Sequence, residues 1–440
     1  MHITSKISHL LTVTGAILGA VTTAVAQTDD ATATSTPYSF YGLGDLARPG
    51  MAYNLGMGGI GTGVRTTRML NFINPAALTA HDTLAFMFDF GLESQNHYAA
   101  NYAASGEKQH SASNSMNIHH LAMSFPVYKR TIVGLALLPY SSIGYDISGR
   151  SNNDALIAEA GHIYYRHVGE GGITQGVMSI ATPIGRHLSL GGQMHYYFGS
   201  IDRYNIVDFE SGSGYSDLTA TQQLKVGNFG FSLGAQYERL LNNGLVLTVG
   251  AGYQFATKIG KRQIDFAYTT TGSLVDTVMW NTRTGDLMSL PATISAGFSL
   301  QQTDRWMVGL DYVFQDWRNS GFGNQPAAKT FKITPSHLVR TGFEWSPERT
   351  NFRSYLKRCT YRIGLSYENT YMQFSGYNVK NTGATIGVGL PINRWNNSIN
   401  LSTEVGRRGT TDYELISETY VKFSLSFSIY DIWFIKPKIE

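Results

Sequence analysis

Residues 188–198, LSLGGQMHYYF, alternate between two kinds of side chain along the whole stretch. Apolar side chains stand at Leu188, Leu190, Met194, Tyr196 and Phe198, and small or polar ones at Ser189, Gly191, Gln193 and His195. Successive side chains of a β-strand point to opposite faces of the sheet, so this stretch predicts a strand with one apolar and one polar face. Such a strand fits a wall that has lipid on one side and water on the other.

The same alternation recurs to the end of the chain. It is found in LVLTVGAGYQF (245–255), WMVGLDYVFQ (306–315), YRIGLSYE (361–368) and KFSLSFSI (422–429). We count about fourteen such strands, of the roughly 9–11 residues or more that a tilted strand needs to cross a bilayer.

The links between these strands distinguish a membrane barrel from a soluble sandwich, whose strands would alternate in the same way. Short or moderate links follow the even-numbered strands, at 128–130, 184–187, 241–244, 302–305, 346–359 and 391–398. Links after odd-numbered strands are mostly long, at 95–114, 146–170, 203–226, 256–285 and 318–332, with shorter ones at 373–378 and 409–415. Short turns on one rim and long loops on the other are typical of outer-membrane proteins. The predicted fold class is therefore all-β, a transmembrane antiparallel β-barrel.

The composition agrees with an exported β-barrel protein. Charged residues make up 15% of the 440 residues, aromatic residues make up 12%, and the net charge is +3 without a basic cluster. Nucleic acid is therefore not an expected partner. The apolar stretch at 10–26 ends in Ala24-Val25-Ala26, which predicts a cleaved export signal over residues 1–26. No later run of 18 apolar residues is present, so strands must make any membrane crossing.

A glycine run and a short turn precede the first predicted strand. The run GMGGIGTG (56–63) matches the pattern G-x-G-x-x-G, but no βαβ unit surrounds it, so we do not expect a dinucleotide site. In NFINPAAL (71–78), the Asn74 side chain can cap a helical turn and Pro75 suits its first position. On local grounds alone this is an ordinary Asn-Pro turn.

The polar faces of the strands supply the candidate lumen residues. Glycine is frequent there, at Gly191, Gly250, Gly252, Gly309, Gly364, Gly387 and Gly389. Glycine weakens a strand, so it indicates either the close approach of another backbone or a ligand, or an easing of the curvature of the barrel. We expect the polar side chains His195, Asp311, Glu368 and Glu404 to face lumen water, the acids against Arg362 and Lys422.

No catalytic or metal-binding pattern is predicted. His119 and His120 are neighbours, and neighbours on a strand point to opposite faces, so they cannot share one ion unless the strand is broken there. Cys359 is the single cysteine, which excludes an internal disulfide and a zinc site built on several sulfurs. We therefore expect no enzyme activity, no cofactor and no metal.

In the order of its motifs, the chain resembles the FadL-type outer-membrane transport proteins, in the form found in Bacteroidetes. The motifs are SFYGLGD (39–45), MGGIGTG (57–63), INPAAL (73–78), PYSSIGY (139–145), GGITQ (171–175), LSLGGQMHYYFGSI (188–201), MVGLDYVFQDW (307–317) and FSLSFSIYDIWFIKPK (423–438). The resemblance implies a barrel over residues 83–440 and an N-terminal hatch over residues 27–82 that plugs its lumen. It also implies that Asn74, Pro75 and Ala76 brace the hatch.

The resemblance implies a function as well. Members of the family sit in the Gram-negative outer membrane, in contact with its lipid, and take up long-chain fatty acids or other hydrophobic small molecules passively. PorV-like relatives instead act as adaptors in type IX protein secretion and bind exported proteins. Both functions remain open from the sequence, and the second would require a protein partner.

Pro139 lies within the third predicted strand. Proline gives no N–H to a strand ladder, and a closed barrel has no edge strand to hold it, so Pro139 predicts a bulge or kink that Gly144 could relax. The alternative is that the strand ends at Leu138. In FadL-like proteins the third strand kinks inward and opens the wall sideways, so the resemblance implies a lateral opening at Pro139 and Gly144.

Overall fold

A computed structural model describes residues 36–102, 108–210, 212–285, 288–322, 331–351, 353–392, 397–411 and 415–432. The predicted export signal and the first part of the predicted hatch, residues 27–35, lie outside these ranges.

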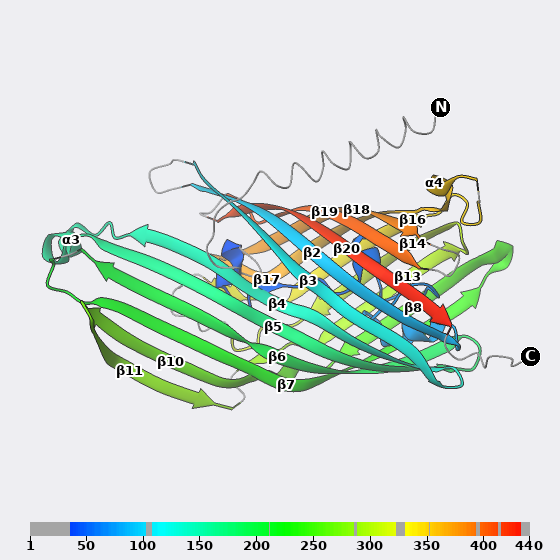
Figure 1. Cartoon of the computed structure of the whole chain (residues 1–440), viewed down its shortest axis with the longest axis horizontal. Helices are drawn as coiled ribbons and strands as arrows, with labels where there is room; N and C mark the ends of the chain where they lie inside the picture. The colour runs from blue at the N-terminus through cyan, green and yellow to red at the C-terminus, as the bar shows by residue number, and fades with distance from the viewer. Residues whose placement is uncertain are drawn as a thin grey trace, which may run out of the picture.

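Fourteen antiparallel strands close into a barrel (Figure 1). They are β2 (Ala85–Tyr102), β3 (Lys108–Tyr128), β4 (Thr131–Arg150), β5 (Ile163–Ile184), β6 (Leu188–Phe209), β7 (Asp217–Leu240), β8 (Leu245–Gln254), β13 (Thr293–Gln302), β14 (Trp306–Gln315), β16 (Ser336–Trp345), β17 (Thr360–Phe374), β18 (Tyr377–Pro391), β19 (Ser398–Arg408) and β20 (Ser417–Ile432). The last strand pairs with the first, from Ala85 opposite Ile432 to Ala100 opposite Ser417. The predicted fold class is confirmed.

The remaining elements are short. Inside the barrel lie η1 (Pro37–Phe40), β1 (Asp45–Leu46), α2 (Ala52–Leu55) and η2 (Pro75–Ala80). In the connections lie α3 (Asp154–Ala160), η3 (Asn242–Gly244), β9 (Thr257–Lys258), β10 (Gly260–Thr271), β11 (Leu274–Thr284), β12 (Ser289–Leu290), β15 (Phe331–Ile333) and α4 (Tyr355–Arg358). Within the described ranges, no helix has the length and apolar character needed to cross a membrane.

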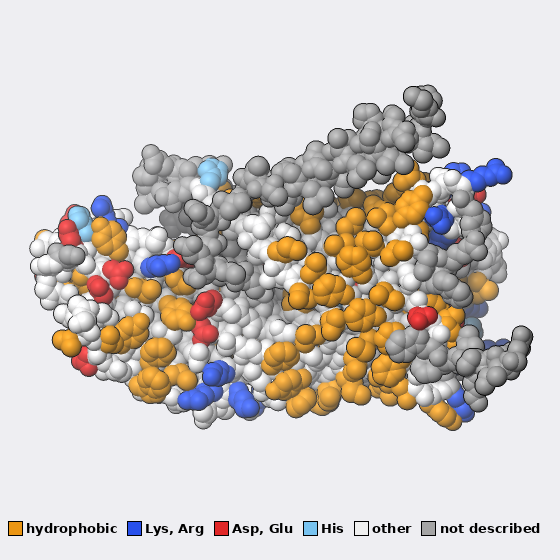
Figure 2. Space-filling view, viewed as in Figure 1, with side chains coloured by type: hydrophobic (Ala, Val, Ile, Leu, Met, Phe, Trp, Pro, Cys, Tyr) orange, Lys and Arg blue, Asp and Glu red, His pale blue; other side chains and the backbone are white. Residues whose placement is uncertain are grey.

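The strand alternation predicted from the sequence is present in β6. Met194 and Tyr196 are 37% and 41% exposed, whereas Gln193 and His195 between them are 6% and 7% exposed. The exposed apolar side chains lie on the outside of the wall, where Figure 2 shows them gathered over one half of the barrel. The outer face therefore suits lipid, and the polar residues point into the lumen.

The segments predicted as long loops are mostly strand. β4 continues to Arg150 and β5 begins at Ile163, and the predicted loop at 256–285 contains the paired strands β10 and β11. These strands project beyond the barrel as a curved sheet at the end where α3 lies (Figure 1). The reason is that pairing in a ladder satisfies the backbone N–H and C=O groups that a loop leaves to water. Hydrophobic periodicity alone does not report this pairing.

Residues 36–82, here called the N-terminal segment, lie inside the barrel and pack on the glycines of the wall. A Cβ atom added to Gly250 would lie 1.9 Å from the Thr62 carbonyl oxygen, and one added to Gly364 would lie 2.1 Å from the backbone nitrogen of Gly58. The backbone of the segment likewise meets Gly191 and Gly387, and a side chain meets Gly309, whereas Gly252 and Gly389 face other wall residues. Close backbone approach therefore accounts for glycine at most of these positions.

Replacing Gly250 and Gly309 with Leu together should displace the N-terminal segment and leave the lipid-facing wall intact. The reason is that the new side chains would occupy the space of Thr62 and Ile60. We expect limited proteolysis of the purified variant to cleave within residues 36–82, which the parent should resist. Gly176→Leu is the control, because nothing lies within 4 Å of a Cβ atom there. Equal protease resistance of the double variant and the parent would contradict this packing.

Candidate functional site

Asn74 ties the N-terminal segment to itself and to the wall. Its Oδ1 accepts a hydrogen bond from the backbone N–H of Ala76 (3.1 Å), which caps η2, and Pro75 occupies the first position of that helix. Its Nδ2 donates to the carbonyl oxygens of Thr62 (2.9 Å) and of Ala235 on β7 (3.1 Å). The side chain is fully buried. Asn74 is thus both a helix cap and a cross-brace between the segment and the wall.

Asp311 on β14 holds the glycine run of the segment. Its Oδ2 accepts hydrogen bonds from the backbone N–H groups of Gly61 (2.7 Å) and Thr62 (2.8 Å), and the residue is 1% exposed. From β7, the Gln236 side-chain amide donates to the Thr62 carbonyl (3.0 Å). Asp311 points into the barrel, but the expectation that it faces water is wrong, because the segment covers it.

Ion pairs fix the segment to the opposite side of the lumen. Arg48 lies 2.7 Å from Glu404 on β19, and Asp45 lies 2.6 Å from Arg408 and 3.6 Å from Lys422. Because these groups are buried, each charge needs its partner close by.

Within the described ranges, the wall acids Asp311, Glu368 and Glu404 form no ion pair with Arg362 or Lys422, although Glu404 stands opposite Lys422 in the β19–β20 register. Arg362 pairs instead with Glu344 (2.8 Å), and Glu368 accepts a hydrogen bond from Asn381 (3.5 Å). The predicted pairing failed because the N-terminal segment supplies cations, such as Arg48 for Glu404, that no pattern within the strands reveals.

His119 and His120 both point into the barrel, contrary to expectation. A bulge in β3 places His120 opposite Gly91 and Ile118 opposite Leu92, so His119 is the extra residue. The two Nδ1 atoms lie 2.9 Å apart, and His120 Nε2 lies 2.5 Å from Asp89. Among the described residues, no group of three or more His, Cys, Asp or Glu side chains is arranged to hold a metal ion.

The wall is broken between β3 and β4. Pairing of the two strands runs from Tyr128 opposite Thr131 to Leu121 opposite Leu137, and it stops there along the described parts of both strands. β4 itself continues paired to β5 as far as Arg150, so the alternative that the strand ends at Leu138 is wrong.

Pro139 and Gly144 lie along the edge of β4 that β3 leaves. A register shift follows Pro139, with Tyr140 as the extra residue. Strand β1 pairs with this edge at Ser141 and Ser142, and the backbone N–H of Thr36 donates to the Gly144 carbonyl (3.1 Å). The N-terminal segment thus covers the edge from inside the barrel.

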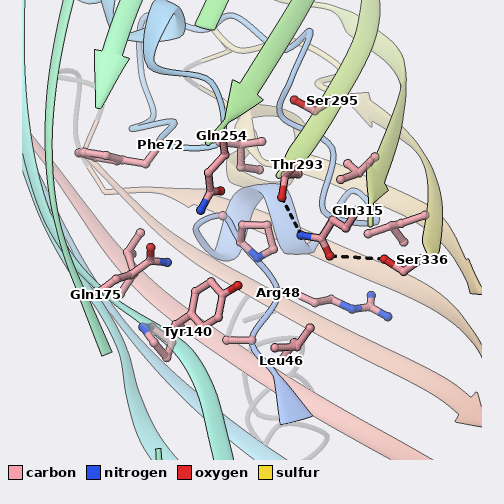
Figure 3. A pocket seen from close by; sticks show the side chains of 18 of the residues that line it. Leu46, Arg48, Phe72, Tyr140, Gln175, Gln254, Thr293, Ser295, Gln315 and Ser336 are labelled. Atoms are coloured by element: carbon pink, nitrogen blue, oxygen red, sulfur yellow. Dashed lines mark hydrogen bonds between the residues drawn. The ribbon is translucent and has the colours of Figure 1, made fainter. Parts of the chain in front are cut away.

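A cavity of about 230 Å³ lies between the N-terminal segment and the wall, beside this break. Leu138, Pro139 and Tyr140 of β4 and His119 of β3 line it, so it reaches both sides of the break. Figure 3 shows the other lining residues from the segment and the wall, among them Leu46, Phe72, Gln175, Gln254 and Gln315. His195 also lines it.

A second cavity of about 550 Å³ lies at the short-turn end of the barrel. Arg65, Arg68, Glu238 and Asp304 are among its lining residues. These four side chains pair across it, Arg65 with Glu238 (3.2 Å) and Arg68 with Asp304 (2.8 Å).

A closed antiparallel barrel of fourteen strands matches the FadL-type barrels. The chain is similar in structure to the Pseudomonas putida toluene transporter TodX (TM-score 0.58, 15% identity, 89% of this chain and 99% of that chain). It is similar also to the Ralstonia pickettii toluene transporter TbuX (0.56, 16%, 87% and 98%) and to a Pseudomonas aeruginosa FadL homologue (0.55, 13%, 88% and 99%). At these identities the likeness shows the fold alone.

The sequence model of the BamG family matches residues 7–440, so the chain belongs to the BamG family. No protein with a curated description matches the chain by sequence.

Sequence reasoning pointed to the break but not to the cavity beside it. Pro139 gave a physical reason for a bulge, and the β4–β5 ladder has a register shift there, while the pairing of β4 with β3 ends two residues earlier at Leu137. Tyr140, Gln175 and Gln254 were not singled out, although Tyr140 and Gln175 lie in the quoted motifs PYSSIGY and GGITQ. Their common position in space depends on strand register, which the motifs do not encode.

Asn74→Ala should loosen the segment by about 1–3 kcal/mol, because it leaves the buried N–H of Ala76 without its partner. We expect the variant to conduct small ions in planar bilayers, where the parent should not. Asn153→Ala is the control, because Asn153 caps α3 outside the lumen by accepting hydrogen bonds from Ala155 and Leu156. Conductance as low as in the parent, even after deletion of residues 71–78, would show that this turn does not close the lumen.

Proposed function

We propose that the protein mediates passive uptake of hydrophobic small molecules across the Gram-negative outer membrane. The observation that carries this proposal is that the 230 Å³ cavity is lined from both sides of the break between β3 and β4. A molecule held in the cavity therefore lies next to an interruption in the wall.

The outer surface beside the break supports a lateral route. On β3, Met116 and Ile118 are 68% and 66% exposed, and on β4, Leu135 and Leu137 are exposed as well. These side chains suit lipid, so the break lies at membrane depth. An apolar molecule that leaves sideways enters the bilayer without crossing periplasmic water, which would cost about 0.8 kcal/mol per methylene group.

In this proposal the N-terminal segment is a hatch. Asn74, Asp311 and the Arg48–Glu404 pair hold it across the lumen, which supports closure of the direct path to the periplasm. The cavity is somewhat larger than the roughly 150 Å³ cavity that holds benzene in a protein core. This size favours small ring compounds, and a long-chain fatty acid would need the cavity to enlarge.

Pro139→Val should slow uptake of hydrophobic molecules. A valine supplies the missing N–H and favours continuous pairing, which would narrow the break. We expect cells that produce the variant to take up radiolabelled toluene, and palmitate if it is a substrate, several-fold more slowly, with no change for a small sugar. Pro183→Val is the control, because Pro183 lies near the other end of β5, opposite Ser189. Unchanged toluene uptake by Pro139→Val would contradict the lateral route.

A second candidate function, an adaptor that binds exported proteins as PorV-like relatives do, is favoured by β11. Every residue of this strand is exposed, including Leu274 (75%), Val275 (66%) and Trp280 (65%). One edge of β11 pairs with β10, and no described strand pairs with the other. A long apolar edge without a partner is suited to adding a strand from another protein.

The two candidate functions make different predictions for a variant of β11. Replacing Val275, Val278 and Trp280 with Thr keeps strand-forming residues and removes apolar surface. If the protein is an adaptor, the amount of exported protein at the cell surface should fall while toluene uptake stays normal. If it serves uptake alone, neither should change. Loss of toluene uptake in this variant would mean that β11 takes part in uptake, which neither candidate function predicts.

A further inference from the structure

We infer that the cavity beside the break selects an uncharged ring compound that carries a hydroxyl group over the plain hydrocarbon. The inference rests on the proposed uptake function and names the class of molecule. A chain of hydrogen bonds carries the inference. At one end a backbone carbonyl fixes which atoms donate and which accept, and at the other end the last side chain faces the cavity.

The fixed end of the chain is the backbone carbonyl of Phe72 in the N-terminal segment. A carbonyl oxygen only accepts, so the Gln193 amide nitrogen must donate to it (3.0 Å), and it donates also to the Ser179 hydroxyl (2.9 Å). The amide oxygen of Gln193 then accepts from the hydroxyl of Ser232 (3.0 Å). The orientation of Gln193 is therefore determined.

The orientation of Gln193 also determines which atoms of Ser232 and His195 donate and which accept. Because the Ser232 hydroxyl has given its hydrogen to Gln193, its oxygen accepts from His195 Nε2 (3.0 Å). His195 is 7% exposed and its two described hydrogen-bond partners are neutral, so its uncharged form is favoured. In that form Nδ1 carries no hydrogen and must accept a hydrogen bond.

Gln175 supplies that hydrogen bond. The amide oxygen Oε1 is placed 3.2 Å from His195 Nδ1, but an oxygen cannot donate to an unprotonated nitrogen, so the network requires the amide nitrogen at this position. A half-turn about the last side-chain bond places the nitrogen on His195 and the oxygen toward the cavity, moving no other residue. The network therefore presents a carbonyl oxygen, a hydrogen-bond acceptor, to a molecule in the cavity.

Two further polar atoms face the same space. The Gln254 amide nitrogen donates to the Tyr197 hydroxyl (2.7 Å), which leaves its amide oxygen, and among the described residues the Tyr140 hydroxyl has no hydrogen-bond partner. Figure 3 shows Tyr140, Gln175 and Gln254 directed toward a common space from β4, β5 and β8. A ligand hydroxyl can both donate to an amide oxygen and accept from Tyr140.

The apolar part of the cavity provides for the ring. Leu46 and Phe72 of the segment and Leu138 of the wall line it, together with the ring of Tyr140. Flat aromatic surfaces of this kind pack well on another ring. The cavity thus has an apolar side for a ring and a polar side for one hydroxyl.

The charges around the cavity do not favour an anion. Four cations line the cavity, Arg48, Arg340, Arg408 and Lys422, together with two carboxylates, Asp45 and Glu368. Arg340 stands opposite Asp311 in the strand register. Because Arg48, Arg408 and Lys422 already lie beside the carboxylates of Glu404 and Asp45, an uncharged hydroxyl compound suits the site better than a carboxylate.

Three related compounds test the inference on the unmodified protein, by calorimetry of the full-length chain in detergent. Toluene has the ring and methyl group, 4-methylphenol adds a hydroxyl, and 4-methylanisole caps that hydroxyl so that it cannot donate. We expect 4-methylphenol to bind about tenfold more tightly than the other two, since one buried hydrogen bond contributes up to about 1.5 kcal/mol. An apolar cavity would show the reverse order, because burial of an unpartnered hydroxyl is unfavourable.

The variant Gln175→Met tests the named acceptor. It keeps the length of the side chain and removes the amide, so it should lower the affinity for 4-methylphenol about tenfold and leave that for toluene unchanged. Gln373→Met is the control, because Gln373 lies at the β17–β18 turn and bonds Asn378 (2.8 Å).

The outcomes separate this inference from the proposed function. Toluene binding as tightly as 4-methylphenol would overturn the inference and leave uptake of hydrophobic molecules standing. An unchanged 4-methylphenol affinity in Gln175→Met would overturn the assignment of Gln175. Absence of binding for all three compounds would contradict the proposed function and the inference together.

Discussion

A strand edge at membrane depth must have its backbone N–H and C=O groups paired, because lipid offers them no partner. The barrel meets this requirement by closing β20 on β2, and it departs from it where β4 loses β3 beyond Leu137. There the N-terminal segment supplies the missing partners, through β1 and the Thr36 N–H. The segment therefore partners the β4 side of the break, and the cavity lies between the two.

Polar contacts and apolar packing together hold the N-terminal segment in the lumen. Asp311 and Asn74 bind backbone groups of the segment, and the Asp45–Arg408 pair joins it to the last strands. Glycines in the wall allow that backbone to approach closely enough for these bonds. The buried charges of Asp45 and Arg48 have their partners on β19 and β20, which helps to give the segment one position in the barrel.

The fold could be predicted well from the sequence because lipid outside and water or polar groups inside impose a period of two on every strand. The alternation of 188–198 and the positions of the short turns needed no tertiary information. Pro139, which has no N–H for a ladder bond, indicated the bulge in β4, whereas the opening of the wall was implied by the resemblance to FadL-type proteins. Three features were not predicted, because each depends on register or on residues far apart in sequence: the bulge that turns His119 inward, the salt bridge between Arg48 and Glu404, and the cavity that Gln175 and Gln254 both line.

The position of the N-terminal segment has a consequence for assembly. Asp45 is bonded to Arg408, 363 positions further along the chain. Contacts of such separation form late, since the intervening chain must be ordered first. The interior therefore cannot be completed before β19 and β20 are in place, and the wall must form around the segment. Without these two strands Asp45 and Arg48 would lack their charged partners and the edge of β2 would be unpaired, so closure of the barrel and completion of its interior depend on the same strands.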